Sequence, residues 1–163
     1  MFGTSKDIKN PGLNILPPGV ERHVVNGGAL TAFQIFPDDE LEIINNEGNQ
    51  ICEIICFNKD GKSDVGILNL KSNNKKNFIR NILNGKDETI LATNHQLKKR
   101  NLNILDSKSS IIFDLDTKAG ESFKLKSKDK CYAIFAAPSE DMDVTNQNPP
   151  SDLTIFIKRS QIV

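Results

Sequence analysis

Three cysteines are the residues in this chain that first suggest a chemical function. Cys52 and Cys56 are four residues apart, and Cys131 lies in a separate apolar run. On a β-strand, which rises about 3.3 Å per residue, the Cα atoms of Cys52 and Cys56 are roughly 13 Å apart, too far for a disulfide or for neighbouring zinc ligands. We therefore predict reduced thiols in the core, although a helix over residues 50–58 would put both on one face.

The two histidines, His23 and His95, offer little support for a metal site. Neither belongs to a His-x-His or His-Glu-x-x-His pattern. We expect structural or surface roles for both, and no metal or other cofactor in this chain. A small cupin-like metalloenzyme or lyase, with an open metal site that uses His23, Cys52, Cys56 or an acidic residue, stays open as an alternative function.

The balance of charge excludes several classes of protein. The 163 residues contain 21 Lys and Arg and 21 Asp and Glu, so the formal net charge is zero and no overall positive field would attract nucleic acid. The sequence has no apolar run near the roughly 18 residues of a membrane span, and its first residues lack the apolar core of a secretory signal. We expect a cytoplasmic protein with neither nucleic acid nor membrane as partner.

Short runs rich in β-branched and aromatic residues predict a mainly β chain. The predicted strands are 21–25, 30–36, 40–45, 50–58, 110–116, 122–126, 130–137 and 152–158. Their spacing is typical of a two-sheet β-sandwich, cupin-like or of a related type, and the tight turns between them predict many hairpins. Prolines and glycines predict an extended arm over residues 1–20, which leaves residues 21–163 as one domain.

Two short helices are predicted in an insert that covers about residues 73–103. Apolar residues at helical spacing predict a helix over residues 73–83, with Asn84-Gly85 as its stop. A second helix over 95–102 would begin with Asn94 as its N-cap.

The strand predicted over 50–58 is apolar on both faces, which is typical of a central strand. Glu53 would then be buried and would need a partner. A second alternative function is a sandwich that binds a small molecule between its sheets. Four phenylalanines would line such a pocket: Phe33, Phe57, Phe113 and Phe135.

Two stretches resemble a known group of proteins. Residues 39–58 comprise a strand, a Glu47-Gly48 turn followed by Gln50, and a strand that ends in Phe57-Asn58; this resembles the core hairpin of urea carboxylase-associated domains. Residues 137–143 (APSEDMD) and 147–153 (QNPPSDL) resemble the closing segment of an amino-terminal domain. That domain precedes urea carboxylase-associated and glycine-cleavage T-protein-like domains in aminomethyltransferase-type proteins, which include trimethylamine N-oxide demethylases.

The resemblance implies a setting in the folate-linked one-carbon metabolism of methylated amines. In such proteins the metal-binding cysteines and the folate pocket belong to other domains, so tetrahydrofolate and a metal are implied only for a partner and no catalytic residue carries over to this chain. We therefore expect a non-catalytic accessory or assembly domain. Its partner would be a T-protein-like or urea carboxylase-associated protein, and a homo-oligomer stays open.

The closing segment has a physical interpretation of its own. Pro149-Pro150 holds the backbone extended, a residue before proline is pushed towards extended conformations, and an aspartate can cap free backbone donors. Such a rigid loop can serve as a docking edge or as a plain connector. The predicted interaction loop contains Asp143, Gln147, Asn148, Pro149, Pro150 and Asp152.

Overall fold

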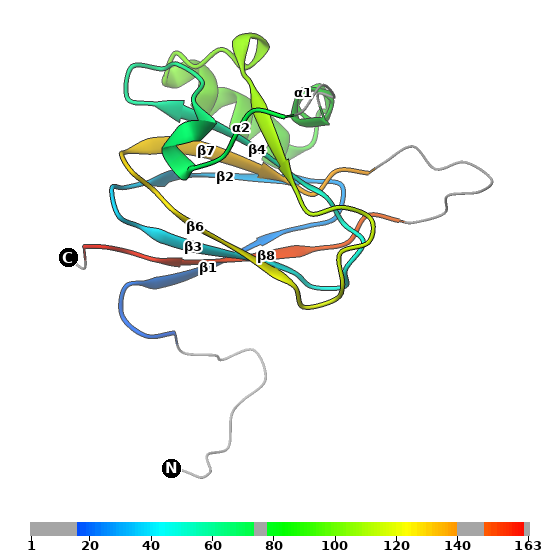
Figure 1. The fold of residues 1–163 in the computed structure, drawn as a ribbon. Helices are drawn as coiled ribbons and strands as arrows, with labels where there is room; N and C mark the ends of the chain where they lie inside the picture. The colour runs from blue at the N-terminus through cyan, green and yellow to red at the C-terminus, as the bar shows by residue number, and fades with distance from the viewer. Residues whose placement is uncertain (1–15, 74–77, 140–148, 162–163) are drawn as a thin grey trace.

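The computed structural model describes residues 16–73, 78–139 and 149–161, and it is mainly β as predicted (Figure 1). Two four-stranded antiparallel sheets pack face to face. The first sheet contains, in spatial order, β1 (Val20–Val25), β8 (Leu153–Lys158), β3 (Glu40–Asn45) and β6 (Ser122–Lys126). The second contains β2 (Leu30–Ile35), β7 (Cys131–Ala136), β4 (Cys52–Asn58) and β5 (Ser109–Ile112). Most of the predicted arm, residues 1–15, lies outside the described residues.

The connections between strands correct the expectation of many hairpins. Each short turn joins strands that lie in opposite sheets, so β1, β2, β3 and β4 alternate between the two sheets, and residues 39–58 do not form a hydrogen-bonded hairpin. The two consecutive strands that do pair, β4 and β5, are separated by the helical insert. A turn motif fixes the reversal of the chain but not the sheet in which the next strand pairs, which is why the sequence suggested hairpins.

The main core fills the space between the two sheets with aliphatic side chains. Ile43 of β3 and Ile155 and Ile157 of β8 are fully buried there, opposite Ile54 of β4 and Phe135 of β7. Burying such side chains contributes about 1.5–3 kcal/mol each. This core is the element that holds the two sheets, and therefore the loops at both ends of the sandwich, in place.

Strand β4 is buried on both faces, as its sequence predicted. Its Glu53 is 1% exposed and has the partners that burial requires: the carboxylate accepts hydrogen bonds from Ile79 N (2.7 Å) and from Ser109 Oγ (3.0 Å). Burial raises the pKa of Glu53 nonetheless. The strand thus carries a carboxylate that anchors the start of the first helix.

Two helices, α1 (Phe78–Leu83) and α2 (Glu88–Lys99), cover the outer face of the second sheet (Figure 1). The first confirms the predicted helix in part, because Asn73 precedes it and residues 74–77 lie outside the described residues. The second begins at Glu88 rather than His95, with Asp87 as N-cap, whose Oδ1 accepts from Ile90 N (2.9 Å). Asn94, predicted as that cap, lies mid-helix and donates to Leu83 O (2.9 Å).

The strand predicted over residues 110–116 ends early, at Ile112. Phe113 has a φ of 67°, a left-handed conformation that interrupts an extended strand. Asp114 then accepts a hydrogen bond from Asp116 N (2.8 Å), which forms a turn. The backbone geometry of Phe113 is therefore what shortens β5.

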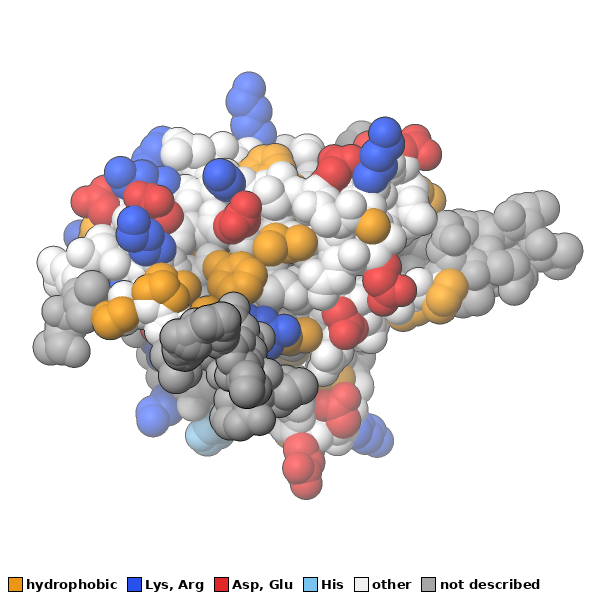
Figure 2. All heavy atoms as spheres, turned by 90° about the horizontal axis from the view of Figure 1, so that it is seen from below, with side chains coloured by type: hydrophobic (Ala, Val, Ile, Leu, Met, Phe, Trp, Pro, Cys, Tyr) orange, Lys and Arg blue, Asp and Glu red, His pale blue; other side chains and the backbone are white. Residues whose placement is uncertain are grey.

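The outer face of the first sheet differs from that of the second. None of the described helices packs against it, and its side chains form mixed rows across the strands, one of which runs Arg22, Phe156, Glu42 and Lys124. Figure 2, seen from this side, shows acidic, basic and hydrophobic side chains interspersed. Among the described helices, none has the length and apolar character needed to cross a membrane.

Candidate functional site

The predicted interaction loop belongs to the connection between β7 and β8, which crosses from one sheet to the other. Asp143, Gln147 and Asn148 lie outside the described residues. Pro149, Pro150 and Asp152 lie within them, where the connection rejoins the sandwich. The base of this loop can therefore be described from both sides.

Gln50 joins the two sides of the loop base. Its side chain is 3% exposed, and its Nε2 donates to Pro138 O (2.9 Å) and to Ile51 O (2.9 Å). Its Oε1 accepts from Ser151 N (2.9 Å). One buried amide thus holds the residues before and after segment 140–148 together, and it satisfies backbone groups that would otherwise be buried without partners.

A contact between Asp152 and Gly27 joins the residues that follow segment 140–148 to the turn between β1 and β2. Asp152 Oδ1 accepts from Gly27 N (2.8 Å), so the capping role predicted for Asp152 exists, but the donor belongs to another turn. A Cβ atom on Gly27 would lie 2.6 Å from the carbonyl carbon and oxygen of Pro150. The two backbones approach so closely that only glycine fits at position 27 without a shift.

A charge network closes the opposite end of the sandwich. Arg159 donates to both carboxylate oxygens of Glu21 (2.8 and 2.9 Å) and to Asp39 Oδ2 (2.7 Å), and Asp39 is 1% exposed. The hydrogen bonds from Arg159 are the largest cause that lowers the pKa of Glu21 to about 2. His23 bonds to Glu21 (3.0 Å) and stacks on Phe33, with ring centroids 4.4 Å apart, which is a structural position.

The cysteines and histidines are not gathered into one site. Cys52, Cys56 and Cys131 are free and buried in the second sheet, while His23 belongs to the first sheet and His95 is exposed on α2. Within the described ranges, no group of three His, Cys, Asp or Glu side chains is placed to hold a metal ion.

Two of the thiols meet across neighbouring strands, which sequence reasoning missed. The thiol of Cys56 of β4 interacts with that of Cys131 of β7, and this interaction together with burial raises the pKa of Cys56, whereas the same interaction lowers the pKa of Cys131. Burial also raises the pKa of Cys52. The raised pKa values disfavour the thiolate of Cys52 and of Cys56, and the thiolate is the nucleophilic and metal-binding form.

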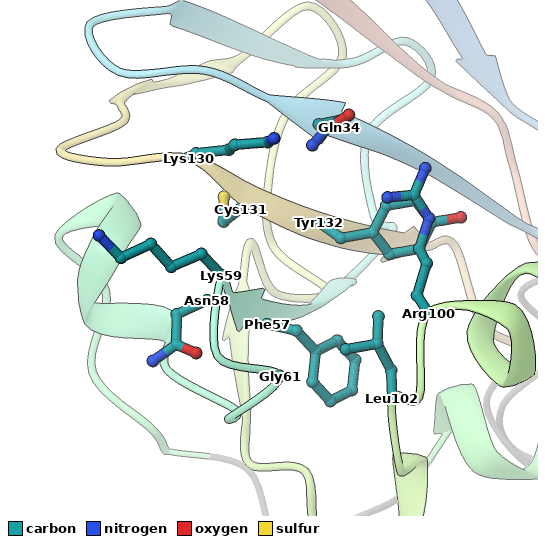
Figure 3. Close-up of a pocket in the computed structure, with 10 residues that line it drawn as sticks. All are labelled: Gln34, Phe57, Asn58, Lys59, Gly61, Arg100, Leu102, Lys130, Cys131 and Tyr132. Carbon is teal, nitrogen blue, oxygen red and sulfur yellow. The ribbon is translucent and has the colours of Figure 1, made fainter.

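A cavity of about 270 Å³ opens at one end of the second sheet, on its helix-covered face (Figure 3). It does not lie between the sheets, where Phe33 stacks on the buried Phe135 with ring centroids 5.1 Å apart. Of the four phenylalanines predicted to line a pocket, Phe57 lines this cavity.

Comparison with known proteins relates the chain to part of a larger one. No protein-family profile matches the sequence. The curated "Trimethylamine-oxide aldolase" of Ruegeria pomeroyi is 30% identical over 153 residues, which are 94% of this chain but 19% of that protein. The chain therefore spans about a fifth of the length of the curated relative it matches. Nearly the whole of this β-sandwich chain is thus related to one part of a trimethylamine-oxide aldolase.

Proposed function

We propose that this chain is a non-catalytic accessory domain in the metabolism of methylated amines, which assembles with a partner that carries the catalytic parts. The observation that carries this proposal is the similarity to a trimethylamine-oxide aldolase over 94% of the chain but only 19% of that protein. A protein of that length has room for several further domains. The partner we propose is a T-protein-like or urea carboxylase-associated protein.

The hydrogen bonds at the base of the predicted interaction loop support a docking role. Gln50 ties both sides of the loop base, and Asp152 and Gly27 fix it to a neighbouring turn. Loops carried by a fixed scaffold often bind partners, and these hydrogen bonds fix both ends of the connection, which favours its use as a docking edge. We propose that segment 140–148 contacts the partner.

The test combines the purified chain with a purified T-protein-like or urea carboxylase-associated protein that processes methylated amines. We expect co-elution in size-exclusion chromatography and a change in the rate of trimethylamine N-oxide consumption. Asp143→Lys, in the loop, should abolish co-elution. The matched control Asp60→Lys lies in the turn after β4, and it should leave co-elution unchanged.

Two results would refute the proposal. The first is the absence of both co-elution and an effect on activity with either class of partner. The second is turnover of trimethylamine N-oxide by the chain alone together with stoichiometric bound metal, which would favour the metalloenzyme alternative.

A further inference from the structure

The floor of the cavity in Figure 3 is built by three strands of the second sheet. Gln34 of β2 and Phe57 of β4 both pair in register with Tyr132 of β7, so the three side chains lie side by side on one face. Leu102, which follows α2, lines the same space. The floor therefore combines apolar surface with the amide of Gln34 and the hydroxyl of Tyr132, a combination typical of small-molecule sites.

Three cations surround this floor without a carboxylate among them. Lys59, Arg100 and Lys130 line the cavity, and no Asp or Glu does. In the part of the chain that the structure describes, none of the three makes an ion pair. Asp60 follows Lys59 in sequence and Asp129 precedes Lys130, but both aspartates are exposed and neither lines the cavity. The cavity therefore has a local positive potential that the zero net charge of the chain conceals.

Arg100 is held in a defined orientation. It is the C-cap residue of α2, and its guanidinium carbon lies 4.5 Å from the centroid of the Tyr132 ring. Stacking on the ring occupies the face of the guanidinium and leaves its N–H groups at the edge available. Figure 3 shows Arg100 across the cavity from Lys59 and Lys130, whose Nζ extends towards Gln34.

The amide of Asn58 is oriented as well. Its Oδ1 accepts hydrogen bonds from Asp60 N (2.9 Å) and Lys62 N (3.0 Å) in the turn that follows β4. The remaining group, Nδ2, is a donor. The three cations, the amide of Gln34 and the Tyr132 hydroxyl, which line the cavity, can all donate hydrogen bonds.

We propose that this cavity binds the anionic oxygen group, phosphate or carboxylate, of a small metabolite. The planar fork of Arg100 matches two oxygens of such a group, and the two lysines add charge from the opposite side. The volume of about 270 Å³ suits a molecule of few heavy atoms, such as a small phosphate monoester or a dicarboxylate.

The test titrates the full chain with inorganic phosphate and, separately, with succinate, followed by amide chemical shifts in NMR at low ionic strength. At about 0.01 M salt the screening length is roughly 30 Å, so weak charge-assisted binding is measurable. We expect saturable shifts at residues 58–61, 100–102 and 130–132. Tighter binding of phosphate would identify a phosphate ester as the ligand class, and tighter binding of succinate a carboxylate.

Two matched variants decide whether the cavity is responsible. Arg100→Gln should weaken binding by about tenfold, which corresponds to the loss of one charge-assisted hydrogen bond. Arg22→Gln removes an equal charge from the exposed outer face of the first sheet and should leave binding unchanged. Arg100→Lys keeps the charge but loses the planar fork, so its affinity should fall between those of the wild type and Arg100→Gln.

Three outcomes would overturn the proposal: no saturable shifts with either anion, shifts that spread over lysines outside the cavity, or equal losses in Arg100→Gln and Arg22→Gln. Thermal unfolding of each variant shows whether it is folded. If Arg100→Gln is unfolded, Lys130→Gln provides the same comparison, with a similar expected loss.

Discussion

Replacement of Gln50 by alanine tests whether a single buried amide holds the loop base together. The change removes three hydrogen bonds, to Pro138 O, Ile51 O and Ser151 N. Gln50 is 3% exposed, so water does not readily replace the lost partners. A buried group left without a partner costs about 1–3 kcal/mol. With partial rescue by water entering the space, we expect the free energy of unfolding to fall by about 3 kcal/mol, a large share of the 5–15 kcal/mol typical of a domain.

The assay is urea unfolding followed by circular dichroism, with amide hydrogen exchange at Ser151 as the local measurement. The matched control is Gln161→Ala, because Gln161 is exposed and makes no hydrogen bond in the described part of the chain. It should change stability by less than about 0.5 kcal/mol. In Gln50→Ala the exchange of Ser151 N–H should accelerate more than exchange in the strand cores does.

Gln50→Glu separates the hydrogen bonds from side-chain volume. A carboxylate can still accept from Ser151 N, but it cannot donate to Pro138 O or Ile51 O. We expect a loss at neutral pH at least as large as that of Gln50→Ala, and a partial recovery in acid, where the protonated group can donate once. A loss below about 0.5 kcal/mol in Gln50→Ala, with unchanged exchange at Ser151, would refute the proposed bridging role.

Two further predictions concern the two ends of the sandwich. Gly27→Ala should lower the thermal unfolding temperature, because the added Cβ atom would lie 2.6 Å from backbone atoms of Pro150. The backbone shift that this requires costs about 1–3 kcal/mol. An unchanged melting temperature would contradict this close approach. Glu21 has a pKa lowered to about 2 from its ordinary value of 4.5, so its stabilising contribution is present above pH 4.5 and disappears as the pH falls towards 2. Glu21→Gln should therefore lower the free energy of unfolding at neutral pH by about 1 kcal/mol, a value reduced because the side chain is 43% exposed. In urea titrations near pH 2 the variant should match the wild type. A difference that does not depend on pH would argue against the ion pair between Glu21 and Arg159.

The strands were the most predictable part of the structure. Alternation and β-branched content located every described strand, because these local properties reflect the burial of each face. The start of α2 was missed because Asn94 and Asp87 are both suitable N-caps. The choice depends on packing: a helix that begins at Glu88 includes Ile90 as well as Leu97, and both belong to the apolar cluster on the outer face of the second sheet. The early end of β5 depends on the φ of Phe113, which residue type did not reveal.

The site was less predictable than the fold, because it depends on strand order. Gln50 belongs to the turn motif of residues 47–50 that is visible in the sequence. Its role, however, depends on Pro138 and Ser151, which lie about a hundred residues away in sequence. The contact between Cys56 and Cys131 likewise requires β7 to pair with β4, and the cationic cavity requires β7 to pair with both β2 and β4. Crossings between sheets at almost every turn make these neighbours distant in sequence.

The pairing of β1 with β8 makes the sandwich suitable for circular permutation. Val20, at the start of β1, lies opposite Lys158, at the end of β8, and Arg159 N donates to Gly19 O (2.7 Å). A short linker could therefore join residues 161 and 16 without crossing the fold. New ends could open within segment 140–148, where Gln50 would hold the severed sides. Such a permutant would keep both sheets while cutting the predicted interaction loop, so it separates the integrity of the loop from the folding of the domain.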